Sequence, residues 1–168
     1  MMEIRFALRD DLSVLKDIFW AHINAHNEYI SHGELQMGVA EADVSGGTLK
    51  TRPAGNGEEM WMKYINAKFD SPDAVIMVAE VDGFITGFCV AEITDDGADP
   101  FGVLCDLLVN GQYRGRGIGG ELLQKTLGWL KGRGISDVYL ESGKNNVGAH
   151  EFFRRRGFVH ISDVFRLV

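Results

Sequence analysis

The sequence is poor in cysteine and contains no long apolar run. Its two cysteines, Cys89 and Cys105, lie in hydrophobic stretches and form neither a CxxC pair nor a Cys/His pattern. This scarcity argues against a disulfide scaffold and a metal site, so we expect two reduced core residues. No stretch approaches the roughly 18 apolar residues of a membrane-spanning helix, and residues 1–11 lack the apolar segment of a signal peptide. The expected location is the cytoplasm.

Basic residues are also scarce, and their distribution is uneven. The 168 residues include 17 Lys and Arg against 24 Asp and Glu, a formal net charge of −7. Residues 1–110 carry 7 basic and 19 acidic side chains, whereas residues 111–168 carry 10 and 5. An acidic first part suits a cationic substrate and a basic second part suits a polyanionic cofactor, although chance also produces such asymmetry. The acidic total argues against nucleic acid as a partner.

The length and the hydrophobic periodicity predict one α/β domain over residues 1–168. A strand over Met2–Leu8 precedes a helix, and residues 27–57 lack clear periodicity and form an irregular or partly helical flap. A tight turn at Asp82-Gly83 and a polar turn over residues 95–100 separate antiparallel strands, and the later strands are parallel. The later elements are a helix over Glu58–Phe69, strands over Ala74–Val81, 84–93 and Phe101–Val109, a helix over Gly117–Lys131, a strand over Asp137–Glu141, a helix over Asn146–Arg156 and a terminal β segment.

A loop rich in glycine and arginine, residues 112–120, joins the strand Phe101–Val109 to the start of the next helix. Glycine lets the backbone approach a ligand closely, and the free N–H groups in the first turn of a helix attract an anion. The two arginines add positive charge. The predicted pyrophosphate site comprises Arg114, Gly115, Arg116, Gly117, Ile118, Gly119 and Gly120.

Other glycine-rich cradles fit this loop less well. Gly115, Gly117 and Gly120 satisfy the dinucleotide-binding pattern GxGxxG, with Asp137 and Glu141 about 20 residues downstream. A dinucleotide domain, however, places that loop after its first strand, whereas an antiparallel hairpin precedes it here. No GK[ST] follows, which argues against a P-loop. A glycine-rich turn that binds nothing is the remaining alternative.

Two spaced motifs resemble those of the GNAT superfamily of N-acetyltransferases. Residues 114–119 (RGRGIG) resemble its acetyl-CoA pyrophosphate motif Q/R-x-x-G-x-G/A, and residues 146–158 resemble its downstream segment N-x-x-A-x-x-x-Y-x-x-x-G-F. The opening residues 4–15 and the strand end 107–109 agree with the family, and only the flap has no match. The resemblance implies a mixed sheet of six to seven strands with a parallel central pair, flanked by about four helices.

The resemblance also implies direct attack of a neutral amine on acetyl-CoA, with both substrates bound together and no metal. In the family the acyl arm lies where the fourth and fifth strands splay apart, and the fourth strand corresponds to Phe101–Val109. Backbone groups of Leu107, Leu108 and Val109 would hold the acyl end and the pantetheine, with an amide N–H at the oxyanion. Asn146 matches the asparagine that often contacts CoA.

The attacking amine must lose a proton, which calls for a carboxylate near the acyl carbon. Asp106 is the first choice because it interrupts an apolar strand. An unpaired carboxylate is energetically costly there unless it has a function or a binding partner. Glu80, Glu92 and Glu141 on neighbouring strands are rivals, and an ordinary charge at a strand edge is the alternative for each.

Phe153 departs from the family, many members of which have a tyrosine thought to protonate the leaving thiolate. Phenylalanine donates no proton. Tyr139, a water molecule or unaided departure of the thiolate therefore remain open, because a thiol is acidic enough to leave without help.

The histidines and large aromatic residues give weaker indications of function than the two motifs. His22 and His26 lie one helical turn apart, but they lack the glutamate of HExxH and a third ligand, so we expect a surface pair. His150 is expected to be exposed. The aromatic residues that could line an acceptor pocket, with core packing as the alternative, are Trp20, Trp61 and Tyr29.

The sequence therefore predicts an N-acetyltransferase that uses acetyl-CoA and acetylates a primary amine of a small cationic acceptor. Two alternatives stay open: a catalytically silent acyl-CoA-binding or regulatory domain, and acetylation of a protein N-terminus or lysine. Neither a membrane nor nucleic acid is expected as a partner. A homodimer is an expectation that the resemblance alone supplies, since no residue specifies an interface.

Overall fold

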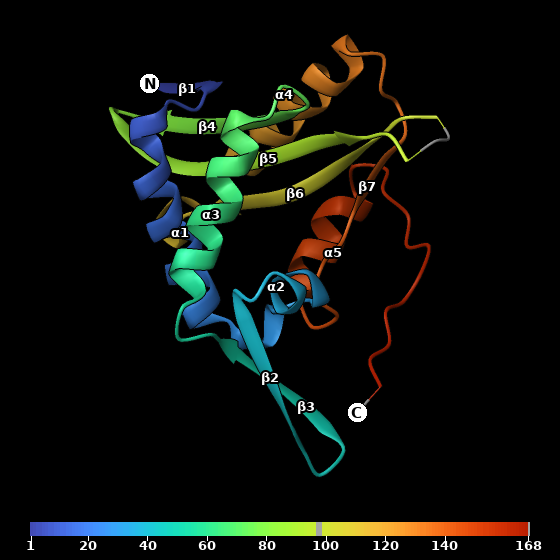
Figure 1. Ribbon diagram of the computed structural model, residues 1–168. Coiled ribbons are helices and arrows are strands. Elements are labelled where there is room, and N and C mark those ends of the chain that lie inside the picture. Colours follow the sequence, from blue (N-terminus) through green and yellow to red (C-terminus); the bar gives the residue numbers. More distant parts are fainter. Residues whose placement is uncertain (97–98, 168) are drawn as a thin grey trace. The chain divides into compact units, whose positions relative to one another are not determined.

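The computed structural model describes residues 1–96 and 99–167 (Figure 1). Residues 97, 98 and 168 lie outside that description, and with them part of the turn predicted over residues 95–100. The chain falls into two compact units. The first unit comprises Met1–His22 and Trp61–Leu140, and the second comprises Ile23–Met60 and the residues from Glu141 onward.

A five-stranded mixed sheet forms the first unit, with the strand order β1-β4-β5-β6-β7 (Figure 1). Neighbouring strands are antiparallel except for β6 and β7, which are parallel, as predicted. The β4–β5 hairpin turns at Asp82 and Gly83, both of which adopt a positive φ. The strands are β1 (Met2–Phe6), β4 (Ala74–Val81), β5 (Phe84–Thr94), β6 (Phe101–Val109) and β7 (Val138–Leu140).

Helices cover both faces of this sheet. Phe88 on β5 packs against Trp61 of α3 with ring centroids 5.9 Å apart, and Trp61 stacks on Phe19 of α1 at 4.8 Å. The next residue on β5, Cys89, faces Thr126 of α4. Because successive strand residues point to opposite faces, α1 and α3 lie on one face and α4 on the other. The helical segments are η1 (Arg9–Asp11), α1 (Leu12–Ala25), α3 (Gly57–Asp70), η3 (Gly111–Tyr113) and α4 (Ile118–Gly132).

The core of the first unit lies between these layers. Trp61, Phe88 and Leu122 are fully shielded from solvent, as is Cys89, whereas Cys105 is partly exposed. Both cysteines are free thiols. Within residues 1–96 and 99–167, no helix has the length and the apolar character to cross a membrane.

The second unit contains a hairpin where the sequence predicted an irregular flap. Strands β2 (Ala40–Ser45) and β3 (Thr48–Pro53) pair antiparallel, and Gly46 and Gly47 turn the chain between them at φ values of 59° and 76°. Both strands are mostly exposed, and the apolar positions on their shared face, Ala40, Ala42, Val44 and Leu49, are few and mostly small, so the alternation is a weak signal. The helical segments of this unit are η2 (Asn27–Tyr29), α2 (His32–Gln36) and α5 (Val147–Arg154).

The predicted fold class is confirmed, but the seven strands of the described chain divide into a sheet of five and a pair instead of forming one sheet, and the parallel pair β6–β7 lies at the edge of the larger sheet rather than at its centre. The expected terminal β segment is wrong, because residues 158–167 form neither helix nor strand. An alternating pattern makes a strand only where another strand pairs with it. Phe165 and Leu167 instead remain 91% and 97% exposed.

Candidate active site

The predicted anion cradle occupies the connection between β6 and α4. Gly115 and Gly117 adopt φ values of 75° and 81°, a left-handed conformation that strains any residue with a side chain. A Cβ atom at either glycine would meet nothing within 4 Å. Backbone conformation, rather than crowding, therefore explains why glycine occupies both positions.

Gly117 is the N-cap of α4, and its carbonyl accepts the amides of Gly120 and Glu121 at 3.0 and 3.2 Å. The amides that precede them in the first turn, those of Ile118 and Gly119, have no intrahelical partner in such a turn. These two N–H groups, together with the positive end of the helix dipole, form an anion site. The loop from residue 112 to residue 120 contains no acidic residue that would oppose an anion.

The two arginines of the loop differ in their contacts. Arg114 donates from Nε to the carbonyl of Val109 at 3.0 Å, and its Nη2 lies 3.2 Å from Nδ1 of His22. Arg116 is exposed, and its guanidinium lies 5.2 Å from the centre of the Tyr113 ring. Arg114 therefore fixes the loop to the end of β6, whereas Arg116 is a cation at the surface of the loop.

Strand β6 contains a β-bulge just before the cradle. The register with β5 pairs Val90 with Asp106 but Ala91 with Leu104, so Cys105 is the extra residue. Across the described part of the chain, β7 pairs with β6 only over residues 102–104. The predicted acyl-binding segment, residues 107–109, therefore has no β7 ladder beside it, and its outward amides and carbonyls suit an extended ligand.

Asp106 accepts a hydrogen bond from Tyr64, a residue of α3 that the sequence did not single out. The Tyr64 hydroxyl lies 2.8 Å from Oδ2 of Asp106. Burial raises the pKa of Tyr64 well above its ordinary value, and the neighbouring carboxylate adds to the rise. Tyr64 therefore remains a hydrogen-bond donor, and Asp106 has the partner that a carboxylate within an apolar strand requires.

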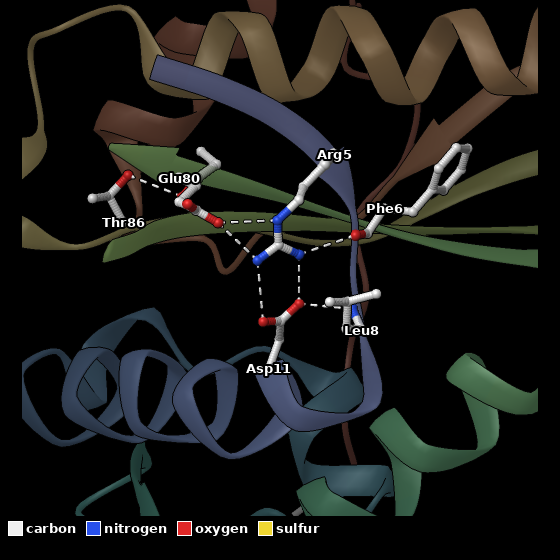
Figure 2. A network of polar contacts seen from close by, with 7 residues as sticks. Arg5, Phe6, Leu8, Asp11, Glu80 and Thr86 are labelled. Carbon is white, nitrogen blue, oxygen red and sulfur yellow. Dashed lines mark hydrogen bonds and ion pairs between the residues drawn. The ribbon is translucent and has the colours of Figure 1, made fainter. Parts of the chain in front are cut away.

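Glu80, a predicted rival base, belongs to a polar network that joins β1, β4 and η1 (Figure 2). Arg5 donates to Oε2 of Glu80 from Nε at 3.0 Å and from Nη2 at 2.9 Å. The same guanidinium binds both carboxylate oxygens of Asp11, at 2.7 and 3.2 Å, and Asp11 also accepts the Leu8 amide at 2.7 Å. The Arg5 guanidinium therefore ties Glu80 to Asp11 and gives Glu80 a role in the fold.

The other two rival carboxylates also have cationic or titratable partners. Glu92 on β5 forms an ion pair with Lys68 of α3. Glu141, which belongs to the second unit, forms an ion pair with Nδ1 of His32 at the start of α2.

Tyr139, a candidate proton donor for the thiolate, and Phe153, at the position of the family's tyrosine, have defined contacts. Tyr139 donates its hydroxyl to Oδ2 of Asp137 at 3.0 Å, and this hydrogen bond raises the pKa of Tyr139. The ring of Phe153 packs edge-on against Phe152 and Phe158, with centroids 5.2 and 5.5 Å away. Tyr139 is therefore a weaker acid than an ordinary tyrosine, and Phe153 fills an apolar cluster.

Asn146 is the N-cap of α5. Its side-chain oxygen accepts the amide of Ala149 at 3.2 Å. Gly157, just past the helix, has a left-handed φ of 91°. The side-chain amide nitrogen of Asn146 is a donor that a ligand can use, because the cap engages the oxygen.

The remaining candidates fall into structural roles. His22 contacts Arg114, whereas the His26 ring stacks on Tyr29 at 4.7 Å. His150 is half-buried, with Nε2 3.0 Å from the Gly143 carbonyl, so the expectation of an exposed residue is wrong. Trp61 is fully buried and belongs to the core.

Among the residues that the structure describes, no group of three or more His, Cys, Asp and Glu side chains is placed to hold a metal ion. A hollow of about 290 Å³ lies in the first unit, between β1, β4, α3 and α4, and none of the cradle residues lines it. Its lining includes Phe6, Phe69, Pro72, Trp129 and Arg133.

Comparison with known proteins gives one family. Residues 48–158 match the model of the acetyltransferase (GNAT) family. N-alpha-acetyltransferase 30 of Schizosaccharomyces pombe is 28% identical over 110 residues, which cover 64% of this chain and 73% of the yeast protein. An uncharacterised N-acetyltransferase of Methanocaldococcus jannaschii is 36% identical over 84 residues, 48% of this chain and 37% of that protein.

A solved structure supports the fold over the whole chain. The aminoglycoside N-acetyltransferase AAC(6')-Iy in complex with CoA has a TM-score of 0.71 and 16% identity, covering 100% of this chain and 94% of the other. At this identity the likeness concerns the fold. The match to the archaeal relative spans about a third of that protein's length.

Proposed function

Because this chain belongs to the GNAT acetyltransferase family, we propose that it transfers the acetyl group of acetyl-CoA to a primary amine of a small cationic acceptor. Both substrates bind together, and the amine attacks the thioester directly. The whole of residues 1–168 acts as one catalytic domain. The two free cysteines support a location in the reducing cytoplasm.

The observation that carries this proposal is the cradle at the start of α4. The left-handed glycines Gly115 and Gly117 bring the chain into α4 so that the amides of Ile118 and Gly119 are available to an anion. A diphosphate needs several N–H donors and a nearby cation, and Arg116 supplies the cation. The donor set therefore fits the diphosphate of CoA.

The acyl arm lies along the part of β6 that has no β7 ladder. Leu107, Leu108 and Val109 offer backbone groups to the pantetheine, and an amide N–H among them stabilises the oxyanion that forms on the acetyl group. Asn146 contributes its side-chain nitrogen to CoA. Backbone groups perform most of this binding, so few side chains identify the site.

Asp106 takes a proton from the acceptor amine. The amine nitrogen forms a bond to the acetyl carbon while the C–S bond breaks and its electron pair stays on sulfur. A protonated acceptor gives up two protons in all. One passes through Asp106 to solvent, and the other ends on the thiol of CoA, delivered by water since Phe153 cannot donate.

A second candidate acceptor is a protein N-terminus or lysine. Its support is the similarity to an N-alpha-acetyltransferase of yeast, whereas the acidic character of residues 1–110 and the fold shared with an aminoglycoside enzyme favour a small cation. A catalytically silent acyl-CoA-binding domain is the third alternative, with Phe153 in its favour. The expected homodimer does not distinguish among these three alternatives.

Acetyl transfer from radiolabelled acetyl-CoA to a panel of amines separates these candidates. The panel contains polyamines, aminoglycosides, amino acids, peptides with a free N-terminus, and N-terminally blocked peptides with one lysine. Transfer to a polyamine or aminoglycoside at a kcat/KM at least tenfold above that of every peptide supports the proposal. Preferential transfer to peptides contradicts the small acceptor, and tight CoA binding without any transfer indicates the silent domain.

A further inference from the structure

We infer that Tyr64 is a positioning residue for the proton acceptor Asp106, acting through the hydrogen bond from its hydroxyl to the carboxylate. The inference rests on the proposed acetyl transfer and adds to it a residue of α3 that acts through Asp106.

The β-bulge in β6 brings Asp106 to Tyr64. Asp106 pairs with Val90, which lies two residues after Phe88 on β5 and therefore points to the same face of the sheet. That face is the one covered by α3, because Phe88 packs against Trp61. Cys105 is the extra residue just before Asp106, so the bulge determines which face the carboxylate meets.

The Tyr64 ring is held on two sides. Trp61, one turn earlier on α3, has its ring centroid 6.1 Å away at a tilt of 55°. Lys68, one turn later, places Nζ 5.5 Å from the centre of the Tyr64 ring. Lys68 is itself held by its ion pair with Glu92 on β5. The hydroxyl therefore approaches Asp106 from a direction that packing determines.

A donor fixed in this way changes Asp106 in two respects. It restrains the rotation of the carboxylate, and it stabilises the charged form, which is the form that accepts a proton. The hydrogen bond from Tyr64 uses one acceptor position of Oδ2, and a carboxylate accepts at about four positions. The other titratable groups near this site are Lys68 of α3, Glu92 of β5 and Cys105 of β6, whereas Cys89 of β5 points to the opposite face of the sheet.

Replacing Tyr64 by Phe removes the hydroxyl and keeps the ring. We expect kcat/KM for the acceptor to fall about tenfold with KM for acetyl-CoA unchanged, because the cradle is untouched. The acidic limb of log(kcat/KM) against pH should also move upward by about one unit, since the carboxylate then protonates more readily. The Asp106→Asn variant should lose that limb altogether.

Thr86→Val provides the matched control. The Thr86 hydroxyl donates to the Ala79 carbonyl at 3.2 Å, so this variant also deletes one hydroxyl hydrogen bond in the same sheet, away from Asp106. It should lower the melting temperature and leave the acidic limb in place.

A second readout uses a weakly basic amine that is already neutral at the assay pH. For this acceptor, the loss of kcat/KM caused by Y64F should be smaller.

The possible outcomes are distinguishable. The inference is supported if the wild type transfers acetyl groups, the D106N variant loses the acidic limb of its pH profile, and the Y64F variant shifts that limb. Turnover in which Y64F lowers only the melting temperature overturns the inference and leaves the proposed function standing. A limb that persists in D106N overturns both Asp106 as the base and Tyr64 as its positioning residue. Absence of acetyl transfer with every amine contradicts the proposed function itself.

Discussion

The Asp11→Asn substitution tests the polar network that joins β1, β4 and η1 (Figure 2). The Arg5 and Asp11 side chains are 24% and 11% exposed, so water screens their ion pair only weakly. Removing one partner of a buried pair costs about 3 to 5 kcal/mol. Because Glu80 still holds Arg5, and because asparagine can still accept the Leu8 amide, we expect a loss of about 2 to 3 kcal/mol. A domain of this size loses about 2 to 4 °C of Tm for each kcal/mol.

The same substitution has a predictable pH dependence. Burial alone would raise the pKa of Asp11, but the hydrogen bonds from Arg5 and from the Leu8 amide outweigh burial and lower it below its ordinary value of 3.8. A carboxyl group with a depressed pKa contributes stability that is complete above its unfolded-state pKa. That contribution is lost as the pH falls through the lower, folded-state pKa. The difference between wild type and D11N should therefore be constant above about pH 5 and shrink below about pH 4.

Urea unfolding at pH 7, 5 and 3 measures this difference, and Asp10→Asn is the control. Asp10 precedes Asp11 in the same turn but is exposed, so its substitution should change the free energy of unfolding by less than about 0.5 kcal/mol. The reasoning is refuted if D11N unfolds with the free energy of the wild type at pH 7. A deficit that stays undiminished at pH 3 would equally refute it.

Three further predictions concern glycine and cysteine. Gly143→Ala should lower the free energy of unfolding, measured with urea, by about 2 kcal/mol, because a Cβ atom there would lie 2.2 Å from the Tyr29 carbonyl oxygen. A decrease of less than about 0.5 kcal/mol would contradict this contact. Gly128→Ala, exposed in α4 with nothing within 4 Å of its Cβ, should instead stabilise the protein by about 0.5 to 1 kcal/mol by the same assay. Burial raises the pKa of Cys89 and Cys105 to about 12, so a thiol reagent at pH 8 should react slowly until guanidinium unfolds the chain; rapid labelling of two thiols in the native protein would contradict this.

The central strands could be predicted from the sequence because their signals are local. β4 and β6 have the predicted bounds, since each is a mostly apolar run between turn residues. The hairpin of β2 and β3 was missed because the apolar residues on one of its faces are few and mostly small, which makes their alternation a weak signal. The error over residues 158–167 has the opposite origin, since that segment is rich in strand-forming Val, Ile and Phe but pairs with no strand of the described chain.

The candidate site likewise has parts that could be predicted from the sequence and parts that could not. The cradle could be predicted because a positive φ at Gly117 and the start of α4 are properties of a few adjacent residues. The partner of Asp106 could not, because Tyr64 lies 42 residues earlier and the sequence gives no sign of their contact. Glu80 and Glu92 could be recognised as partnered residues only once Arg5 and Lys68 were placed beside them.

Calorimetric titration of CoA into the wild type and the Gly117→Ala variant tests the cradle most directly. Alanine at a φ of 81° costs about 1 to 2 kcal/mol of backbone strain and tilts the amides of the first turn of α4 away from their ligand. We predict saturable binding of CoA to the wild type and to the control Gly128→Ala, with NAD binding more weakly, and at least tenfold weaker CoA binding to Gly117→Ala. Equal CoA affinity in all three proteins, or no heat of CoA binding to the wild type, would contradict a diphosphate site at the start of α4.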